Sequence, residues 1–222
     1  MQSLIFGPPD LWPRNQDAVC STREFDAELT LEAYRAGLFP MPISGMRDTA
    51  GVTWWSPLER GILEPSRLRV SKSLKKSAKR YRTTIDAAFD RVLAACADPS
   101  RPYGWIDAQI RAVYTELHQR GVVHSVECWD AEDRLAGGLY GVSLGGLFAG
   151  ESMWHDPQHG RDASKVALLR LTEQFSDSHP SLIDVQWLTP HLATLGAQAI
   201  PREAYLARLD DLLRAPGPAW GR

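Results

Sequence analysis

Residues 122–156 read VVHSVECWDAEDRLAGGLYGVSLGGLFAGESMWHD. Three runs of strand-forming residues are separated by turn residues, among them Gly145 and Gly146, and this pattern predicts an antiparallel meander. The third run breaks at Gly150 and continues at once with Glu151, a carboxylate in an otherwise apolar stretch. Burying a charged side chain without partners is costly, so the position of Glu151 points to a functional or a strongly hydrogen-bonded role.

Helical patterns flank the meander. A helix capped by Asp107 is expected over 108–121, a second helix over 163–175, and a buried strand over 181–188. The expected order of elements is a long helix, three antiparallel strands, a crossover helix and a further strand. This order resembles that of acyltransferases of the acetyltransferase (GNAT) type. We therefore expect an α+β fold, with a mixed, mostly antiparallel sheet flanked by helices. Fold alone does not decide function.

The chain is expected to divide into a small N-terminal α/β domain over 1–64 and a GNAT-like domain over 65–214. Asp26 begins a predicted helix that ends near Gly37, and residues 52–65 read as two short strands around a turn. Two short helices are expected after the last strand. Residues 215–222, APGPAWGR, have the composition of a mobile tail.

Composition excludes several classes of protein. With 44% apolar and 23% charged residues among 222, the chain is typical of a globular protein. No apolar run approaches the roughly 18 residues of a membrane helix, and the N-terminus lacks the pattern of a signal peptide, so we expect a cytoplasmic protein without membrane contact. The three cysteines form no C-x-x-C pair. His155 and His159, with Asp156 between them, have no further ligand at a suitable spacing, so no metal is expected.

A basic segment stands out against a net charge of only −2. Residues 67–82, RLRVSKSLKKSAKRYR, hold eight basic residues and no acidic one. At helical spacing over 71–80, one face carries the lysines and the opposite face carries apolar anchors: Lys72, Lys75, Lys76 and Lys79 against Val70, Leu74, Ala78 and Tyr81. A solvated helix face is the plain alternative. The absence of acidic partners favours binding of a polyanion such as RNA or DNA.

Asp184 lies inside the apolar strand predicted over 181–188, and strand alternation places it on the same face as Gln186. A buried carboxylate of this kind is either held by structural hydrogen bonds or acts as a base, and the pattern leaves both readings open. Glu151 repeats the situation on a neighbouring run, so these polar groups are expected to converge on one site.

Several motifs in order resemble the leucyl/phenylalanyl-tRNA–protein transferase family. They are WWSP at 54–57, RVSKSLKK at 69–76, GWI at 104–106, the meander itself, ASKVALL at 163–169, LIDVQ at 182–186, TPHLATLGA at 189–197 and IPREAYLARL at 200–209. The resemblance implies transfer of Leu or Phe, with Met as a further candidate, from an aminoacyl-tRNA to the α-amine of proteins that begin with Arg or Lys. Proteins tagged in this way are degraded as N-degron substrates. The resemblance implies no cofactor and a monomer.

The resemblance also implies roles for particular residues. Asp184, with Gln186, would assist deprotonation or orientation of the attacking amine, and Glu151 would help to hold the aminoacyl end. Trp105 would pack near the terminal adenosine. An apolar pocket would be formed by Leu139, Phe148, Met153, Leu168, Phe175 and Ile183, with Gly150 allowing close approach of substrate. The acceptor stem would be gripped by Lys72, Lys75, Lys76, Lys79 and Arg80.

Two of the departures from the family pattern bear on amino-acid selectivity and on the fit of the tRNA end. Met41 follows the Phe-Pro pair where the family usually has Trp, and the loop from Met153 to Ala163 is about three residues longer than usual. That longer loop contains QHGRDA at 158–163, which fits the pyrophosphate loop of acetyltransferases, so an acetyl-CoA-dependent N-acetyltransferase is the main alternative. A non-catalytic RNA-binding or degradation-adaptor protein is the third candidate.

Overall fold

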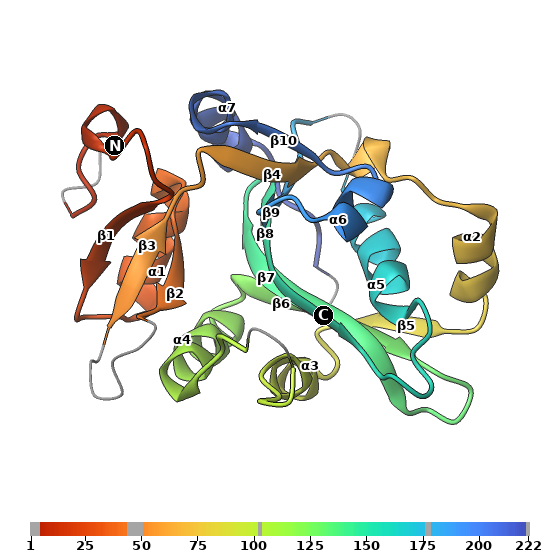
Figure 1. Ribbon diagram of the computed structural model, residues 1–222. Coiled ribbons are helices and arrows are strands. Elements are labelled where there is room, and N and C mark those ends of the chain that lie inside the picture. The colour runs from red at the N-terminus through yellow and green to blue at the C-terminus, as the bar shows by residue number, and fades with distance from the viewer. Residues whose placement is uncertain (1–4, 44–50, 102–103, 176–178, 221–222) are drawn as a thin grey trace.

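The computed structural model describes residues 5–43, 51–101, 104–175 and 179–220. The N-terminal part forms a three-stranded antiparallel sheet in the order β1-β3-β2, with helix α1 beside it (Figure 1). Its elements are the 3-10 turn η1 (Pro9–Leu11), β1 (Ala18–Thr22), α1 (Ala27–Ala36), β2 (Phe39–Pro42) and β3 (Val52–Trp55). The predicted helix is confirmed at both ends: the Asp26 carboxylate accepts a hydrogen bond from the Leu29 N–H at 2.8 Å, and Gly37 ends the helix with φ 87°. Strands β1 and β2 were not predicted.

The main sheet has seven strands in the order β10-β4-β9-β8-β7-β6-β5. These are β4 (Glu59–Leu63), β5 (Arg82–Ile85), β6 (Val123–Trp129), β7 (Leu135–Leu144), β8 (Leu147–His155), β9 (Leu182–Gln186) and β10 (Gln198–Pro201). Strands β8 and β9 pair in parallel, and the other neighbours among the described residues pair antiparallel. The predicted mixed α+β fold, with a mostly antiparallel sheet, is confirmed.

Strand β4 belongs to the main sheet, where it pairs with β9 and β10. The expected boundary at 64 would have assigned this strand to the N-terminal domain. Sheet membership instead changes between Trp55, the last residue of β3, and Glu59, the first residue of β4. The two short strands predicted over 52–65 therefore exist, but they lie in different sheets and do not form a hairpin.

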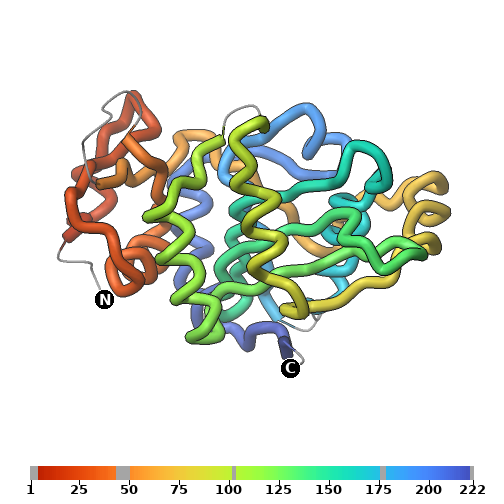
Figure 2. Tube along the Cα trace, turned by 90° about the horizontal axis from the view of Figure 1, so that it is seen from below, coloured from red at the N-terminus to blue at the C-terminus, as the bar shows by residue number. Residues whose placement is uncertain are grey.

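Helices cover both faces of the main sheet (Figures 1 and 2). α3 (Phe89–Cys96) and α4 (Ala108–Gln119) lie side by side on one face, and α5 (Ala163–Thr172) packs on β6 and β7 from the other. The basic helix α2 (Lys72–Ala78) follows the 3-10 turn η2 (Pro65–Arg67) and packs against α5. Two helices follow β9: α6 (Pro190–Thr194) is short as predicted, whereas α7 (Arg202–Arg214) has 13 residues.

The C-terminal segment is packed, in contrast to the predicted mobile tail over 215–222. The Trp220 ring stacks on His124 with a centroid distance of 4.3 Å, and its indole N–H donates to the Ser143 Oγ at 3.1 Å. Burying a large aromatic surface outweighs the Gly- and Pro-rich composition around it. Residues 221 and 222 lie outside the described residues.

The seam between β8 and β9 determines where a site can form. β9 pairs with β8 only along residues 147–149, whereas β8 continues beside β7 as far as His155. The two strands therefore separate at Gly150. Just there β8 carries a β-bulge: Gly150 faces Gly141 and Ser152 faces Tyr140, which leaves Glu151 as the extra residue. A bulge re-aims the side chain that it carries, so Glu151 leaves the alternation of the strand.

Candidate functional site

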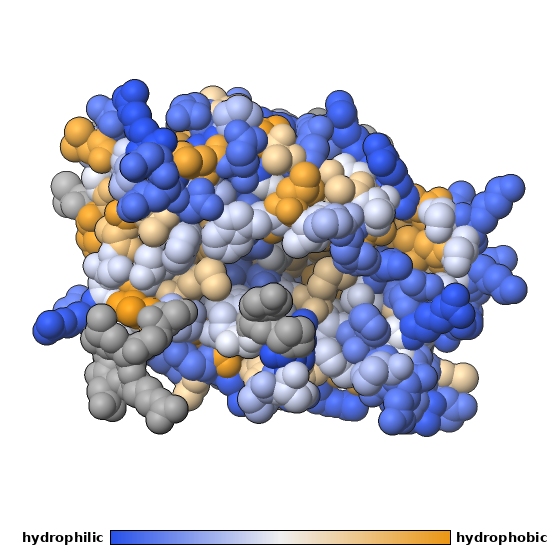
Figure 3. Space-filling model, in the orientation of Figure 1, coloured by the Kyte–Doolittle hydropathy of each residue, from blue (hydrophilic) through white to orange (hydrophobic). Residues whose placement is uncertain are grey.

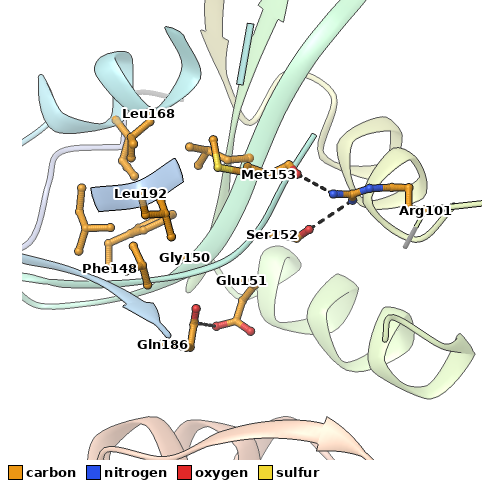
Figure 4. A pocket seen from close by; sticks show the side chains of 13 residues that line it. Arg101, Phe148, Gly150, Glu151, Ser152, Met153, Leu168, Gln186 and Leu192 are labelled. Carbon is orange, nitrogen blue, oxygen red and sulfur yellow. Dashed lines mark hydrogen bonds between the residues drawn. The ribbon is translucent and has the colours of Figure 1, made fainter. Parts of the chain in front are cut away.

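An apolar cavity of about 280 Å³ lies where β8 and β9 separate (Figure 4). Six of the seven residues predicted for the apolar pocket line it: Leu139, Phe148, Gly150, Met153, Leu168 and Ile183. The sequence analysis missed Leu171, Val185 and Leu192 on its apolar wall and Arg101 at its edge. Phe175, which lies beyond the end of α5 at Thr172, is not among the lining residues. We call this space the aminoacyl cavity.

The protein atoms around Gly150 leave room for a side chain at this position. A Cβ atom there would meet the Asp184 carbonyl oxygen at 3.6 Å and Phe148 at 4.0 Å, which are ordinary contacts. Its backbone does not require glycine for conformational reasons either, since it is not among the residues with positive φ. A glycine that packing does not demand leaves space for a ligand. In the orientation of Figure 1, the surface of the molecule is hollowed near its centre (Figure 3).

A second cavity, of about 220 Å³, adjoins the first. Three of its seven lining residues are aromatic, and the wall is formed by Phe39, Pro40, Met41, Trp105, Glu151, Gln186 and Trp187. Phe39 and Trp187 pack edge to face at 5.0 Å. Met41, where the resemblance implied Trp, is part of this wall. Glu151 and Gln186 line both cavities and mark their junction. We call this space the aromatic cavity.

The Glu151 carboxylate is held from three elements. The Tyr114 hydroxyl, on α4, donates to its Oε2 at 3.1 Å, and the Gln186 side-chain amide donates to its Oε1 at 3.2 Å. Tyr34, on α1, places its Oη 2.6 Å from the Tyr114 Oη. A chain of two phenols thus links the N-terminal helix to Glu151. Neither tyrosine was predicted, because each lies in the ordinary apolar stripe of its helix.

Glu151 is the group in this site whose charge is least fixed. Burial raises its pKa to about 7, and the nearby Asp184 carboxylate adds to the rise, while hydrogen bonds from Tyr34 and Tyr114 and the charge of Arg60 oppose it. A carboxyl group with a pKa near 7 can accept a proton and return it at neutral pH, which is the requirement for general acid–base catalysis.

The Asp184 carboxylate is surrounded by hydrogen-bond donors. Its Oδ1 accepts hydrogen bonds from the Arg60 Nε at 2.8 Å and the Gln186 N–H at 2.9 Å, and its Oδ2 accepts from the Arg60 Nη2 at 2.5 Å and the Tyr205 hydroxyl at 2.9 Å. Burial, the largest single influence, lowers the pKa of Arg60, but Asp184, Tyr205 and Tyr34 together outweigh it, so the pKa of Arg60 is raised. Of the two readings of Asp184, the geometry is that of a structural carboxylate. Arg60 was not predicted.

Gln186 does not follow the alternation on which its expected position rested. Its φ is 59°, in the left-handed region that a residue with a side chain rarely adopts. The hydrogen bond from its N–H to the Asp184 carboxylate supports this conformation and directs the side chain to Glu151. A strained backbone held by a buried ion pair is a feature that clusters at functional sites.

The basic helix has the predicted two faces. Lys72, Lys75, Lys76, Lys79 and Arg80 are exposed, whereas Leu74 is buried. Among the described residues, no ion pair involves these four lysines. Several hydrogen bonds tie the helix region to the loop between β8 and α5. The shortest two run from the Ser77 Oγ to Asp162 at 2.9 Å and from the Tyr81 hydroxyl to the Arg161 carbonyl at 2.8 Å.

That loop does not present the free amides of a pyrophosphate-binding loop. The N–H groups of Gln158 and His159 both donate to the Asp156 carboxylate, at 2.8 and 2.9 Å, and the Gly160 N–H donates to the Asp156 carbonyl. A protein carboxylate thus occupies the place that the acetyltransferase reading gives to a phosphate.

In the part of the chain that the structure describes, no helix is long and apolar enough to cross a membrane.

Comparison with known proteins points in one direction. Residues 62–210 match the family model described as leucyl/phenylalanyl-tRNA protein transferase, and residues 23–58 match the model of its N-terminal domain. The leucyl/phenylalanyl-tRNA–protein transferase of Afipia carboxidovorans is 47% identical over 198 residues, which cover 87% of this chain and 85% of that protein. The enzyme of the same name from Zymomonas mobilis is 46% identical over 192 residues, or 85% and 69% of the two chains.

One solved structure resembles the chain weakly. It is a functionally unknown conserved protein from Staphylococcus epidermidis, with a TM-score of 0.45 and 11% identity over 83% of this chain and 68% of that one.

Proposed function

Because the chain belongs to the leucyl/phenylalanyl-tRNA–protein transferase family and is therefore an aminoacyltransferase, we propose that it transfers Leu or Phe to the α-amine of proteins that begin with Arg or Lys. This tagging would direct the acceptor to degradation. The observation that carries the proposal is the junction of an apolar and an aromatic cavity at Glu151 and Gln186.

Each cavity fits one half of an aminoacyl-adenosine. The aminoacyl cavity, walled by Leu, Ile, Val, Phe and Met side chains, suits an unbranched-at-Cβ apolar side chain such as Leu or Phe, with Met as a third candidate. In the aromatic cavity, Trp105 and its neighbours offer flat surfaces on which the terminal adenine can stack. The ester that joins the two halves would then lie beside Glu151.

The chemistry needs little beyond positioning. The α-amine attacks the ester carbonyl carbon, an amide bond forms, and the ester C–O bond to the ribose breaks. Ionised Glu151 accepts the proton that the amine loses and returns it to the ribose oxygen. Asp184 acts through Gln186, whose conformation it fixes, and is a positioning residue. Because the ester is already activated, no covalent enzyme intermediate is required.

The remaining expectations belong to the same proposal. The exposed lysines of α2, with Arg80, would contact phosphates of the tRNA acceptor stem. The enzyme would work in the cytoplasm as a monomer, and its two domains would meet between Trp55 and Glu59. The acetyl-CoA-dependent alternative is less well supported, because Asp156 already occupies the loop amides at 158–160.

A transfer assay tests the proposal. Labelled Leu or Phe on tRNA is offered to a peptide with N-terminal Arg, beside the N-acetylated peptide and a peptide with N-terminal Ala as controls. We expect label on the free-amine Arg peptide alone. Absence of transfer from both charged tRNAs, together with saturable binding of acetyl-CoA, would instead establish the acetyltransferase.

A further inference from the structure

A third cavity, of about 660 Å³, lies on the other side of the aminoacyl cavity from the aromatic one. It shares Arg101 and Met153 with the aminoacyl cavity. Its remaining lining residues are Asp98, Ser100, Trp154, His155, Pro157, Ser164 and His191. None of these seven residues has a role in the function proposed above.

Strand β8 and the loop after it connect the spaces in order. Glu151 lies at the junction of the aromatic and aminoacyl cavities, Met153 lies between the aminoacyl and third cavities, and His155 lines the third cavity alone. After His155 the chain continues into the loop between β8 and α5. Ser77 and Tyr81, at the C-terminal end of the basic helix, hydrogen-bond to this loop. The third cavity therefore lies between the reaction centre and α2, which Figure 1 shows at the far end of the main sheet.

The lining combines groups that single-stranded nucleic acid can contact. Arg101 supplies a cation whose guanidinium also donates to the Cys96 and Met153 carbonyls, and Asp98 supplies one carboxylate of opposite charge. His155, His191, Ser100 and Ser164 supply groups that hydrogen-bond, and Trp154, which is half-buried, supplies an aromatic ring. Cations that contact phosphates, together with aromatic rings on which bases stack, are the usual means of holding unpaired nucleotides.

We propose that the third cavity binds the unpaired nucleotides that precede the terminal adenosine at the 3′ end of the donor tRNA. This inference rests on the proposed function, since it needs the adenosine in the aromatic cavity and the acceptor stem on α2. The strand would pass from α2 along the β8 edge, with a base on Trp154 and a phosphate beside Arg101. An acceptor polypeptide that begins with Arg or Lys is the other macromolecule that could enter, but its cation would meet Arg101.

Donors of increasing length test the assignment. Transfer of Phe to one peptide is measured from phenylalanyl-adenosine, from the phenylalanyl ester of the trinucleotide cytidylyl-cytidylyl-adenosine, and from Phe-tRNA. The variants are His191→Ala, which removes an exposed side chain, and Trp154→Ala, with Trp154→Phe as the partner that keeps an aromatic ring. Arg214→Ala, on α7, is the control, since Arg214 lines none of the three cavities.

We expect the ratio of kcat/KM for the trinucleotide donor to that for phenylalanyl-adenosine to fall about fivefold or more in His191→Ala and Trp154→Ala. It should remain near the wild-type value in Trp154→Phe and Arg214→Ala. An unchanged ratio in both alanine variants would overturn the proposal. So would a rise in KM for the peptide that is equal with all three donors, which would assign the cavity to the acceptor. Wild-type enzyme that transfers from no donor would refute the proposed function itself.

Discussion

Arg60 and Asp184 form a two-pronged ion pair in which the two side chains are only 1% and 0% exposed. The same carboxylate receives the Gln186 N–H, and the Gln186 side chain in turn holds Glu151. Arg60 comes from β4 and Asp184 from β9, so the pair joins two neighbouring strands of the main sheet and fixes the geometry of the site. A loss of activity on changing Asp184 can therefore arise without any direct part in the chemistry.

A paired substitution separates these roles. Asp184→Asn alone leaves the buried Arg60 charge without a partner, so we expect it to lower the free energy of unfolding by about 3 to 5 kcal/mol in urea denaturation. Arg60→Met combined with Asp184→Asn removes the unpaired charge and keeps an oxygen for the Gln186 N–H. The double variant should regain most of the stability and more than a tenth of the wild-type kcat. A stable double variant with no transfer activity would show that the carboxylate itself is needed.

Glu151 should control the pH dependence of transfer. Because burial raises its pKa to about 7, kcat/KM should rise as pH increases through 7 and the carboxyl group ionises. Glu151→Gln cannot accept a proton, so its rate should fall roughly a hundredfold or more at pH 8, as expected for loss of a general base. The measurement is a pH–rate profile with a peptide acceptor. The acceptor's own α-amine also titrates, near pH 8, and a set of peptides with different amine pKa values separates the two limbs.

The raised pKa of Glu151 also affects the free energy of unfolding. Its pH dependence has the opposite sign to that of a salt-bridged acid, whose pKa is lowered on folding. The folded protein binds the Glu151 proton more tightly than the unfolded chain does. This contribution to stability is complete below about pH 4.5 and is lost as pH rises towards 7. Glu151→Gln should remove this dependence. The unfolding free energy of the variant minus that of the wild type should therefore increase from pH 5 to pH 8. A difference that is constant across this range would mean that the pKa is not raised.

The phenol chain should tune Glu151. The Tyr114 hydroxyl stabilises the ionised carboxylate, so Tyr114→Phe should raise the pKa of Glu151 further, move the limb of the pH–rate profile to higher pH and reduce the rate several-fold at pH 7. Tyr140→Phe is the matched control, since this buried hydroxyl has no hydrogen-bond partner among the described residues. The control should keep the wild-type profile. Equal profiles for both variants would exclude a role for Tyr114 in setting the charge of Glu151.

Leu192 should influence the choice of amino acid. It lies on α6 and forms part of the wall of the aminoacyl cavity. Leu192→Ala enlarges the cavity, so transfer of Leu should fall about tenfold while the larger Phe side chain loses less. Competition between Leu-tRNA and Phe-tRNA measures this ratio directly. Leu188→Ala, a change at an exposed leucine that lines none of the three cavities described above, should leave the ratio unchanged.

Local signals in the sequence predicted the elements and much of the site, whereas long-range partners escaped it. Caps at Asp26 and Asp107 and the rhythm of the meander gave the helices and strands, because these signals depend on neighbours in the chain. Arg60 is 124 residues from its partner Asp184, and Tyr34 is 80 from Tyr114, so no local pattern marks either pair. Strand β4 was assigned to the wrong neighbour for the same reason. The bulge at Glu151 likewise depends on the register with β7.

Trp220 should support the aminoacyl cavity from behind. Its ring lies 5.8 Å from that of Phe148, a residue of the cavity wall, and stacks on His124. Trp220→Ala removes both contacts, so we expect a loss of about 1 to 2 kcal/mol of unfolding free energy and a rise in KM for the aminoacyl-tRNA, with kcat less affected. Trp220→Phe keeps a ring and should retain most of both properties. If Trp220→Ala has wild-type stability and KM, then the packed segment over 215–220 contributes nothing to the site, and the tail acts as the mobile end that its composition predicted.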